Sequence, residues 1–220
     1  MAAKGPDSGK ELIISMIKGG EKACTEYCKL SGGYWLNRAP EYFLTTYAAS
    51  ALRNFGSTSI GLEVSVNKSR KEANAVRNGR PSQHDRRNGR YDIVLYRADD
   101  KPRGCVEVKS SLYSVDRRRL VPDFVRLCST LNSKERSSIQ FSGLLFFASV
   151  AAPQRGKDTE EERLNALLMR INDLAKESSE KYNVSQNLLK SKIRVDPNGG
   201  GAWCIGCVVF SNNGTGQNFR

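Results

Sequence analysis

Apolar residues recur at helical spacing in several segments of the chain. In residues 10–30 they fall one helical turn apart, which predicts a helix ending before Gly32 and Gly33. Residues 40–53 predict a second helix, with Pro40 suited to its first position. Residues 160–181 carry the clearest apolar stripe, and residues 115–131 are expected to be partly helical, with Pro122 starting or breaking that helix.

Other segments alternate or run apolar over lengths typical of strands. Residues 60–66 alternate, and residues 142–149 and 201–210 are apolar runs that predict buried strands. Residues 90–96 and 104–110 are rich in β-branched and aromatic side chains, and turn-forming residues 98–103 separate them. This arrangement predicts a β-hairpin within an α/β fold.

The predicted hairpin carries three ionisable residues, Asp92, Glu107 and Lys109. Side chains alternate faces along a strand, so Glu107 and Lys109 share one face while Val106 and Val108 share the other. A turn over residues 98–103 sets Asp92 opposite Lys109, and a turn one residue earlier sets it opposite Glu107. The three side chains cluster in either register, since opposed Cβ atoms lie about 4.5–5.5 Å apart.

Two neighbouring carboxylates repel each other unless a proton or a cation lies between them. Mg²⁺ is bound by oxygen ligands, often one or two carboxylates with water and substrate phosphate. A lysine two residues after the glutamate can contact that phosphate or help to activate water. The alternative is a solvent-exposed hairpin with a weak ion pair.

The order Asp92, hairpin, Glu107-Val108-Lys109 resembles the active-site signature of the PD-(D/E)xK, or restriction-endonuclease-like, nuclease superfamily. The resemblance covers residues 40–148 and implies a helix, three strands, a helix and a further strand, forming a central mixed β-sheet flanked by helices. Tyr91 stands where the pattern often has proline.

The resemblance further implies a nuclease that uses Mg²⁺ or Mn²⁺ to hydrolyse phosphodiester bonds, with DNA favoured as substrate. The metal ligands would be Asp92, Glu107 and the Val108 carbonyl, while Lys109 would orient water and stabilise the phosphate. An additional glutamate is implied, and Glu41 fits that place better than Glu63; Glu41 could instead only stabilise its helix. Two alternatives stay open: an RNA-directed nuclease and a non-catalytic nucleic-acid-binding module.

The net charge of +12 and the pI near 9.6 favour a polyanionic partner. Basic residues crowd residues 67–90, which we interpret as a mobile insertion that contacts phosphates, and a second basic block follows the third strand. A solvated surface is the alternative. The candidate nucleic-acid-binding residues in these two blocks are Arg77, Arg80, Arg86, Arg87, Arg117 and Arg118.

The 220 residues and 39% hydrophobic content predict one domain, with a core over residues 40–150 and an extension over residues 151–210. We expect residues 211–220 to form a polar tail. No apolar run suits a membrane span or a secretory signal, which favours a cytoplasmic protein with reduced thiols. A homodimer or a partner protein is compatible with the sequence.

Two further pairs of residues have two interpretations each. Cys204 and Cys207 with Cys24 and Cys28 could supply zinc ligands, but Cys204 and Cys207 lie in an apolar run that indicates a buried strand. Asp123 and Arg126 are one helical turn apart, so they could pair with each other or support the site from their helix.

Overall fold

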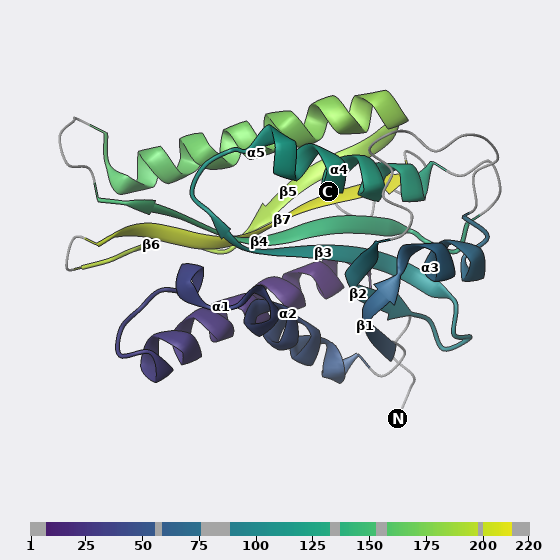
Figure 1. The fold of residues 1–220 in the computed structure, drawn as a ribbon, viewed down its shortest axis with the longest axis horizontal. Coiled ribbons are helices and arrows are strands. Elements are labelled where there is room, and N and C mark those ends of the chain that lie inside the picture. Colours follow the sequence, from purple (N-terminus) through teal and green to yellow (C-terminus); the bar gives the residue numbers. More distant parts are fainter. Residues whose placement is uncertain are drawn as a thin grey trace.

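One mixed β-sheet runs through the computed structural model, which describes residues 8–55, 59–75, 89–132, 137–152, 158–197 and 200–212 (Figure 1). The strands are β1 (Ser59–Ser65), β2 (Arg90–Tyr96), β3 (Pro102–Leu112), β4 (Phe141–Ala151), β5 (Val184–Lys190), β6 (Arg194–Val195) and β7 (Gly201–Asn212). Their order is β1-β2-β3-β4-β7-β5, and the short β6 also pairs with β7. Among the strand pairs of the described residues, only β3–β4 is parallel.

Helices cover both faces of this sheet (Figure 1). Helices α1 (Gly9–Leu30) and α2 (Glu41–Ser50) lie on one face, with short 3₁₀ turns at Leu36–Arg38 and Ala51–Asn54. Helices α4 (Arg117–Leu131) and α5 (Glu160–Tyr182) lie on the other, and α3 (Val66–Glu72) sits between β1 and β2 in the chain. None of the helices in the described ranges is long and apolar enough to cross a membrane.

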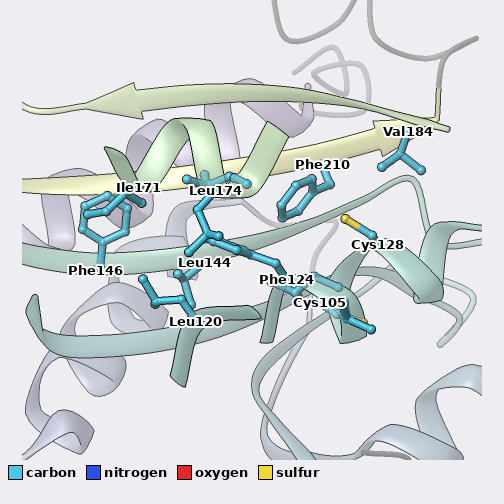
Figure 2. Packing of buried hydrophobic residues seen from close by; sticks show 14 of the residues in the cluster. Cys105, Leu120, Phe124, Cys128, Leu144, Phe146, Ile171, Leu174, Val184 and Phe210 are labelled. Carbon is cyan, nitrogen blue, oxygen red and sulfur yellow. The ribbon is translucent and has the colours of Figure 1, made fainter. Parts of the chain in front are cut away.

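Two apolar layers hold the helices to the sheet. In the layer under α4 and α5, the rings of Phe124 and Phe210 pack edge to face with centroids 5.7 Å apart, and Figure 2 shows Leu174 near them and Phe146 beside Ile171 in the same layer. The opposite layer joins α1 and α2 to residues such as Ile93 and Val106. Strands β4 and β7 are buried on both faces, which explains their continuous apolar sequences, since each buried side chain of this size stabilises the fold by about 1.5–3 kcal/mol.

Helix α4 connects the two parallel strands. Parallel neighbours cannot be joined by a tight turn and need a crossover, usually a helix. The chain therefore leaves β3, forms α4 and returns as β4, which lays α4 over the face of β3 that carries Glu107 and Lys109. This connection decides which side chains can reach the predicted hairpin site.

Most predicted elements are confirmed. The helices expected over residues 10–30, 40–53 and 160–181, the hairpin, and the strands expected over residues 60–66, 142–149 and 201–210 are present within a few residues. Helix α2 begins at Glu41, one residue after Pro40. The 3₁₀ turn Ala51–Asn54 follows its last residue directly. Strand β5 was not predicted because its half-buried, mostly polar residues show no clear alternation, and β6 was not predicted because it has only two residues, both exposed.

Three predictions need correction. Pro122 neither starts nor breaks a helix, because α4 begins at Arg117 after the N-cap Asp116 and continues through the proline. Residues 67–72 are not part of a loop but form most of α3, which the side chain of Ser65 caps. Ser211 and Asn212 belong to β7 rather than to a tail, because they continue its pairing with β4 and β5. Residues 76–88 and 213–220 of these two segments lie outside the described residues.

Candidate active site

The β2–β3 hairpin sets Asp92 beside Glu107. The ladder pairs Ile93–Val106 and Val94–Cys105 define the register; the ladder ends at Ile93, and Asp92 contacts β3 through the amide of Val108. The ladder register is the second of the two registers that the sequence allowed. A shift in pairing at Tyr96 absorbs the extra residue of the turn. The two carboxylates therefore lie on adjacent strands.

Asp92 is held by the backbone of the neighbouring strand. Its Oδ2 accepts a hydrogen bond from the amide of Val108 at 2.6 Å. Burial raises the pKa of Asp92 to about 6, and the Val108 amide and the positive charge of Lys109 oppose that rise only in part. The Val108 amide thus orients the carboxyl group. Its surroundings compensate its negative charge only in part, so a bound cation would stabilise the ionised form.

Glu107 is more deeply buried, with only 3% of its surface exposed. One oxygen, Oε2, contacts the guanidinium of Arg126 at 2.7 Å. The other, Oε1, is buried and has no hydrogen-bond partner among the described residues. Burial raises the pKa of Glu107 to about 8 despite Arg126, and the negative charges of Asp92 and Asp123 add to the rise. An unpartnered buried carboxylate oxygen is costly, and it marks a place that can accept a cation.

Arg126 joins two acids from different elements. A single guanidinium nitrogen lies 2.7 Å from Glu107 Oε2 and 2.8 Å from Asp123 Oδ1. Asp123 and Arg126, which both belong to α4, are buried. The two interpretations of Asp123 and Arg126 therefore both apply: they pair with each other one turn apart, and they also contact the hairpin.

Lys109 lies between two carboxylates. Its Nζ is 3.6 Å from Asp123 of α4 and 3.6 Å from Glu41 of α2, and its side chain is 18% exposed. Burial works against the charged amine, yet Asp123 and Glu41 outweigh it and raise the pKa of Lys109. The lysine is thus kept positively charged and partly accessible to solvent.

Glu41 approaches the hairpin from the opposite layer. Its Oε2 accepts a hydrogen bond from the amide of Ser110 at 3.3 Å, while Oε1 faces Lys109. Glu41 also occupies the first turn of α2, where the helix dipole favours a carboxylate. This position fits the helix-stabilising role, whereas the carboxylate contacts Lys109 and Ser110 and does not join Asp92 and Glu107 in a group of three ligands among the described residues.

Glu63 lies at the edge strand beside Asp92. The pairs Leu62–Ile93 and Val64–Tyr91 bracket it, and its backbone has φ of 53°, a left-handed conformation uncommon outside glycine. The residue is exposed, and its negative charge contributes to the raised pKa of Asp92. No contact in the described structure ties its carboxylate to the other acids.

A buried polar cluster behind the site was not found from the sequence. Arg70 of α3 donates to the Arg126 carbonyl at 3.1 Å and to Ser129 Oγ at 2.8 Å, and Thr130 bonds to both Arg70 and Tyr91. These bonds anchor the turn of α4 that carries Arg126. From the sequence, Arg70 was assigned to the basic segment of residues 67–90. Its charged neighbours gave no indication that its side chain would be buried.

The candidate nucleic-acid-binding residues divide into two groups. Arg77, Arg80, Arg86 and Arg87 lie outside the described residues, as does His84. Arg117 and Arg118 lie in the first turn of α4, and both are exposed. Arg117 forms a two-bond pair with Glu177 of α5, at 2.7 and 3.2 Å. Among the described residues, Arg118 forms no ion pair of this kind.

A groove of about 960 Å³ begins where the chain leaves β3 and runs along α5. Three arginines and four acids line it, together with exposed Tyr113, so its charges are mixed. The charged lining residues are Arg117, Asp158, Glu162, Arg163, Arg170, Asp173 and Glu177. A groove of this composition is not a continuous track for phosphates, and the catalytic candidates do not line it.

The residues present fit a divalent cation. Asp92 and Glu107 supply carboxylates, the buried Oε1 of Glu107 needs a positive partner, and the Val108 carbonyl belongs to the same strand. In the part of the chain that the structure describes, no three His, Cys, Asp or Glu side chains converge on one point. Two carboxylates completed by water and a carbonyl are a common set for Mg²⁺.

The zinc alternative does not fit the strand geometry. Cys204 packs in the layer beneath α4 and α5, whereas Cys207 packs in the opposite layer. Two thiols on opposite faces of one sheet cannot ligate the same ion with tetrahedral geometry. The pair instead fills both apolar layers of β7.

Comparison with known proteins adds no identification: no family model, no curated protein and no solved structure matches this chain.

Proposed function

We propose that this protein is a metal-dependent nuclease of the PD-(D/E)xK type that hydrolyses phosphodiester bonds. The observation that carries the proposal is the buried, unpartnered Glu107 Oε1, with the Asp92 carboxylate on the adjacent strand and charged Lys109 two residues later. A surface hairpin with a weak ion pair, the alternative reading, would have left Glu107 in solvent rather than 3% exposed.

The order of the elements supports the same proposal. Helix α2, the meander β1-β2-β3, the crossover helix α4 and the parallel strand β4 follow one another as the resemblance implies, with α3 inserted between β1 and β2. Asp92 and Glu107 occupy the second and third strands of this series. The remaining strands extend the sheet beyond β4.

The cation would be held by Asp92, Glu107 and the Val108 carbonyl, where Mg²⁺ or Mn²⁺ would polarise a phosphate oxygen and promote the ionisation of water. The Val108 amide keeps the Asp92 carboxyl oriented through the 2.6 Å hydrogen bond. Lys109 offers a positive charge to the negative charge that develops on the phosphate. Asp123 and Glu41 hold that lysine in place from both layers of the fold.

DNA is the favoured substrate because of the superfamily resemblance, and the net charge of +12 would attract either nucleic acid. Exposed Arg118 and the arginines of residues 76–88 are the proposed phosphate contacts. Such contacts supply affinity without reading sequence.

The experiment is cleavage of double-stranded DNA, single-stranded DNA and RNA, each with Mg²⁺, with Mn²⁺ and with chelator. We expect cleavage of DNA that requires metal and that Asp92→Asn and Glu107→Gln abolish. Asp99→Asn is the matched control, because it neutralises an exposed carboxylate at the turn of the same hairpin, where it pairs with Lys101 at 3.8 Å.

Each other outcome has a definite meaning. Cleavage of RNA alone would replace the substrate and keep the chemistry. Tight binding to nucleic acid without cleavage by either metal would favour the binding module. Full activity in Glu107→Gln would refute the proposed site.

A further inference from the structure

The buried face of the site contains a second pair of carboxylates, and a protein cation already lies between them. Glu107 Oε2 and Asp123 Oδ1 both contact the same nitrogen of Arg126, at 2.7 and 2.8 Å. A cation at that nitrogen's position therefore meets one oxygen from β3 and one from α4. This is the arrangement that a second metal ion would require, with a guanidinium in its place.

The position is built rather than accidental. Arg126 is 6% exposed, and the Arg70 side chain bonds to its backbone carbonyl, so the turn of α4 cannot easily move away. Removal of a buried guanidinium from its carboxylates is strongly unfavourable. A metal ion would have to displace Arg126 to enter between Glu107 and Asp123.

The charge of the contact network indicates how many metal ions it needs. The network contains four carboxylates and two cations, so two negative charges remain uncompensated when every group is ionised. One divalent ion neutralises them, whereas two would leave an excess of positive charge. Ion pairs join Glu41, Glu107, Asp123, Lys109 and Arg126. Asp92 forms no ion pair among the described residues and is counted as the fourth carboxylate because the positive charge of Lys109 acts on it.

We propose that this site binds a single divalent cation, on the side of Asp92 and Glu107 Oε1, and that Arg126 permanently occupies the place of a second. The inference rests on the metal assignment in the proposed function. Glu107 then has a divided role: Oε2 is committed to Arg126, and Oε1 is the oxygen left for the metal.

This arrangement has a consequence for catalysis. Paired metal ions can stabilise both the attacking and the leaving oxygen of a phosphoryl transfer. With one ion, the second of these tasks falls to a protein side chain, and Lys109 is the partly exposed cation of the network. Arg126 acts as a positioning residue, because its contacts are to carboxylates in the buried interior.

The first test is the stoichiometry of Mn²⁺ binding to the full chain without nucleic acid. Titration calorimetry and the loss of the free-Mn²⁺ electron paramagnetic resonance signal both count bound ions. We expect one Mn²⁺ per chain with the spectrum of an isolated ion. Two ions per chain, or the spectrum of two coupled ions, would overturn the inference without requiring any variant.

The second test releases the carboxylate pair. Arg126→Met keeps an apolar stem of similar length but removes the charge, so Glu107 and Asp123 become available together. We expect stoichiometry to rise from one to two Mn²⁺ and a coupled spectrum to appear. Arg126→Lys keeps a cation there and should still bind one ion. The double variant Arg126→Met/Asp123→Asn, which lacks the second carboxylate, should also bind one.

Lys176→Met is the control for loss of positive charge, because Lys176 is exposed on α5, where it pairs with Glu180. It should bind one Mn²⁺, as should the wild type. If folded Arg126→Met, verified by circular dichroism, binds only one, Arg126 is not occupying a metal position and the inference fails. If Arg126→Met does not fold, the wild-type and Arg126→Lys stoichiometries decide.

Failure of the inference is distinguishable from failure of the proposed function. Two bound ions together with metal-dependent cleavage would refute only the single-ion inference. Absence of any Mn²⁺ binding would refute both the inference and the metal assignment. One bound ion without cleavage of any nucleic acid would uphold the inference and refute the proposed nuclease activity.

Discussion

Helix α4 carries two arginine–carboxylate pairs with the same shortest distance and opposite surroundings. At its first turn, Arg117 lies 2.7 Å from Glu177 of α5, and the two side chains are 63% and 57% exposed. Further along the same helix, Arg126 lies 2.7 Å from Glu107 of β3, and the side chains are 7% and 4% exposed. Distance alone does not separate a surface pair from a pair in the interior.

Burial changes what each pair contributes. Water screens the Arg117–Glu177 pair, and exposed pairs contribute about 0–1 kcal/mol. The Arg126–Glu107 pair has lost its hydration, so the favourable attraction is largely spent on desolvation, while loss of one partner costs about 3–5 kcal/mol. The buried pair also leaves Glu107 Oε1 and Arg126 Nε without partners among the described residues, which the exposed pair does not. Unsatisfied buried charge is therefore the feature that separates the candidate site from the surface.

The largest contrast should be between the stability lost on replacing Arg126 and the stability lost on replacing Arg117. Arg126→Ala leaves Glu107 and Asp123 buried without their cation, so we expect the free energy of unfolding to fall by about 3–5 kcal/mol. Arg117→Ala should lower it by about 1 kcal/mol or less. Urea denaturation followed by circular dichroism measures both. Equal losses would show that the 2.7 Å distance, rather than burial, governs these pairs.

Loss of Lys109 should affect catalysis more than binding. The lysine is placed to act on charge that develops in the transition state, so Lys109→Ala should lower single-turnover cleavage by on the order of a hundredfold. Affinity for the substrate, measured by fluorescence anisotropy at the same salt concentration, should change much less. Lys101→Ala, at the exposed turn of the same hairpin, is the control. A cleavage rate at the wild-type level in Lys109→Ala would contradict the proposed role.

Loss of Arg118 should affect binding more than catalysis. If Arg118 contacts one phosphate, Arg118→Ala should reduce the slope of log affinity against log salt by about 0.9 on duplex DNA. Affinity at moderate salt should weaken by roughly threefold, with all sequences affected alike. Single-turnover cleavage of the saturated complex should remain near the wild-type rate. An unchanged salt slope would place Arg118 outside the interface.

The smallest effect should come from the exposed pair itself. A double-mutant cycle with Arg117→Ala and Glu177→Ala should give a coupling free energy of about 0.2–1 kcal/mol, decreasing in high salt. If nucleic acid competes for Arg117, Glu177→Ala should slightly strengthen binding, because it releases the guanidinium. A coupling above about 2 kcal/mol would mean that this surface pair is far less screened than its exposure implies.

Local pattern was sufficient for most elements of the fold. Helices and strands with a strong apolar period, such as α5 and β4, were predicted because one face or both faces of each are buried. The weak, half-buried β5 was not. Helix α4 through Pro122 was misread because the apolar contacts of the helix, including those of Phe124, outweigh the local cost of proline.

For the site, the sequence determined the hairpin and the shared face of Glu107 and Lys109, because both follow from the two-residue period of a strand. It also supplied Glu41, Asp123 and Arg126 as candidates with two possible roles each. Tertiary structure decided the rest: the register of β2 against β3, the crossover that lays α4 over β3, and the burial that pairs Arg126 with two carboxylates. Contacts between residues far apart in the chain depend on how layers pack, and burial sets the strength of a charge pair, so neither is encoded in local spacing.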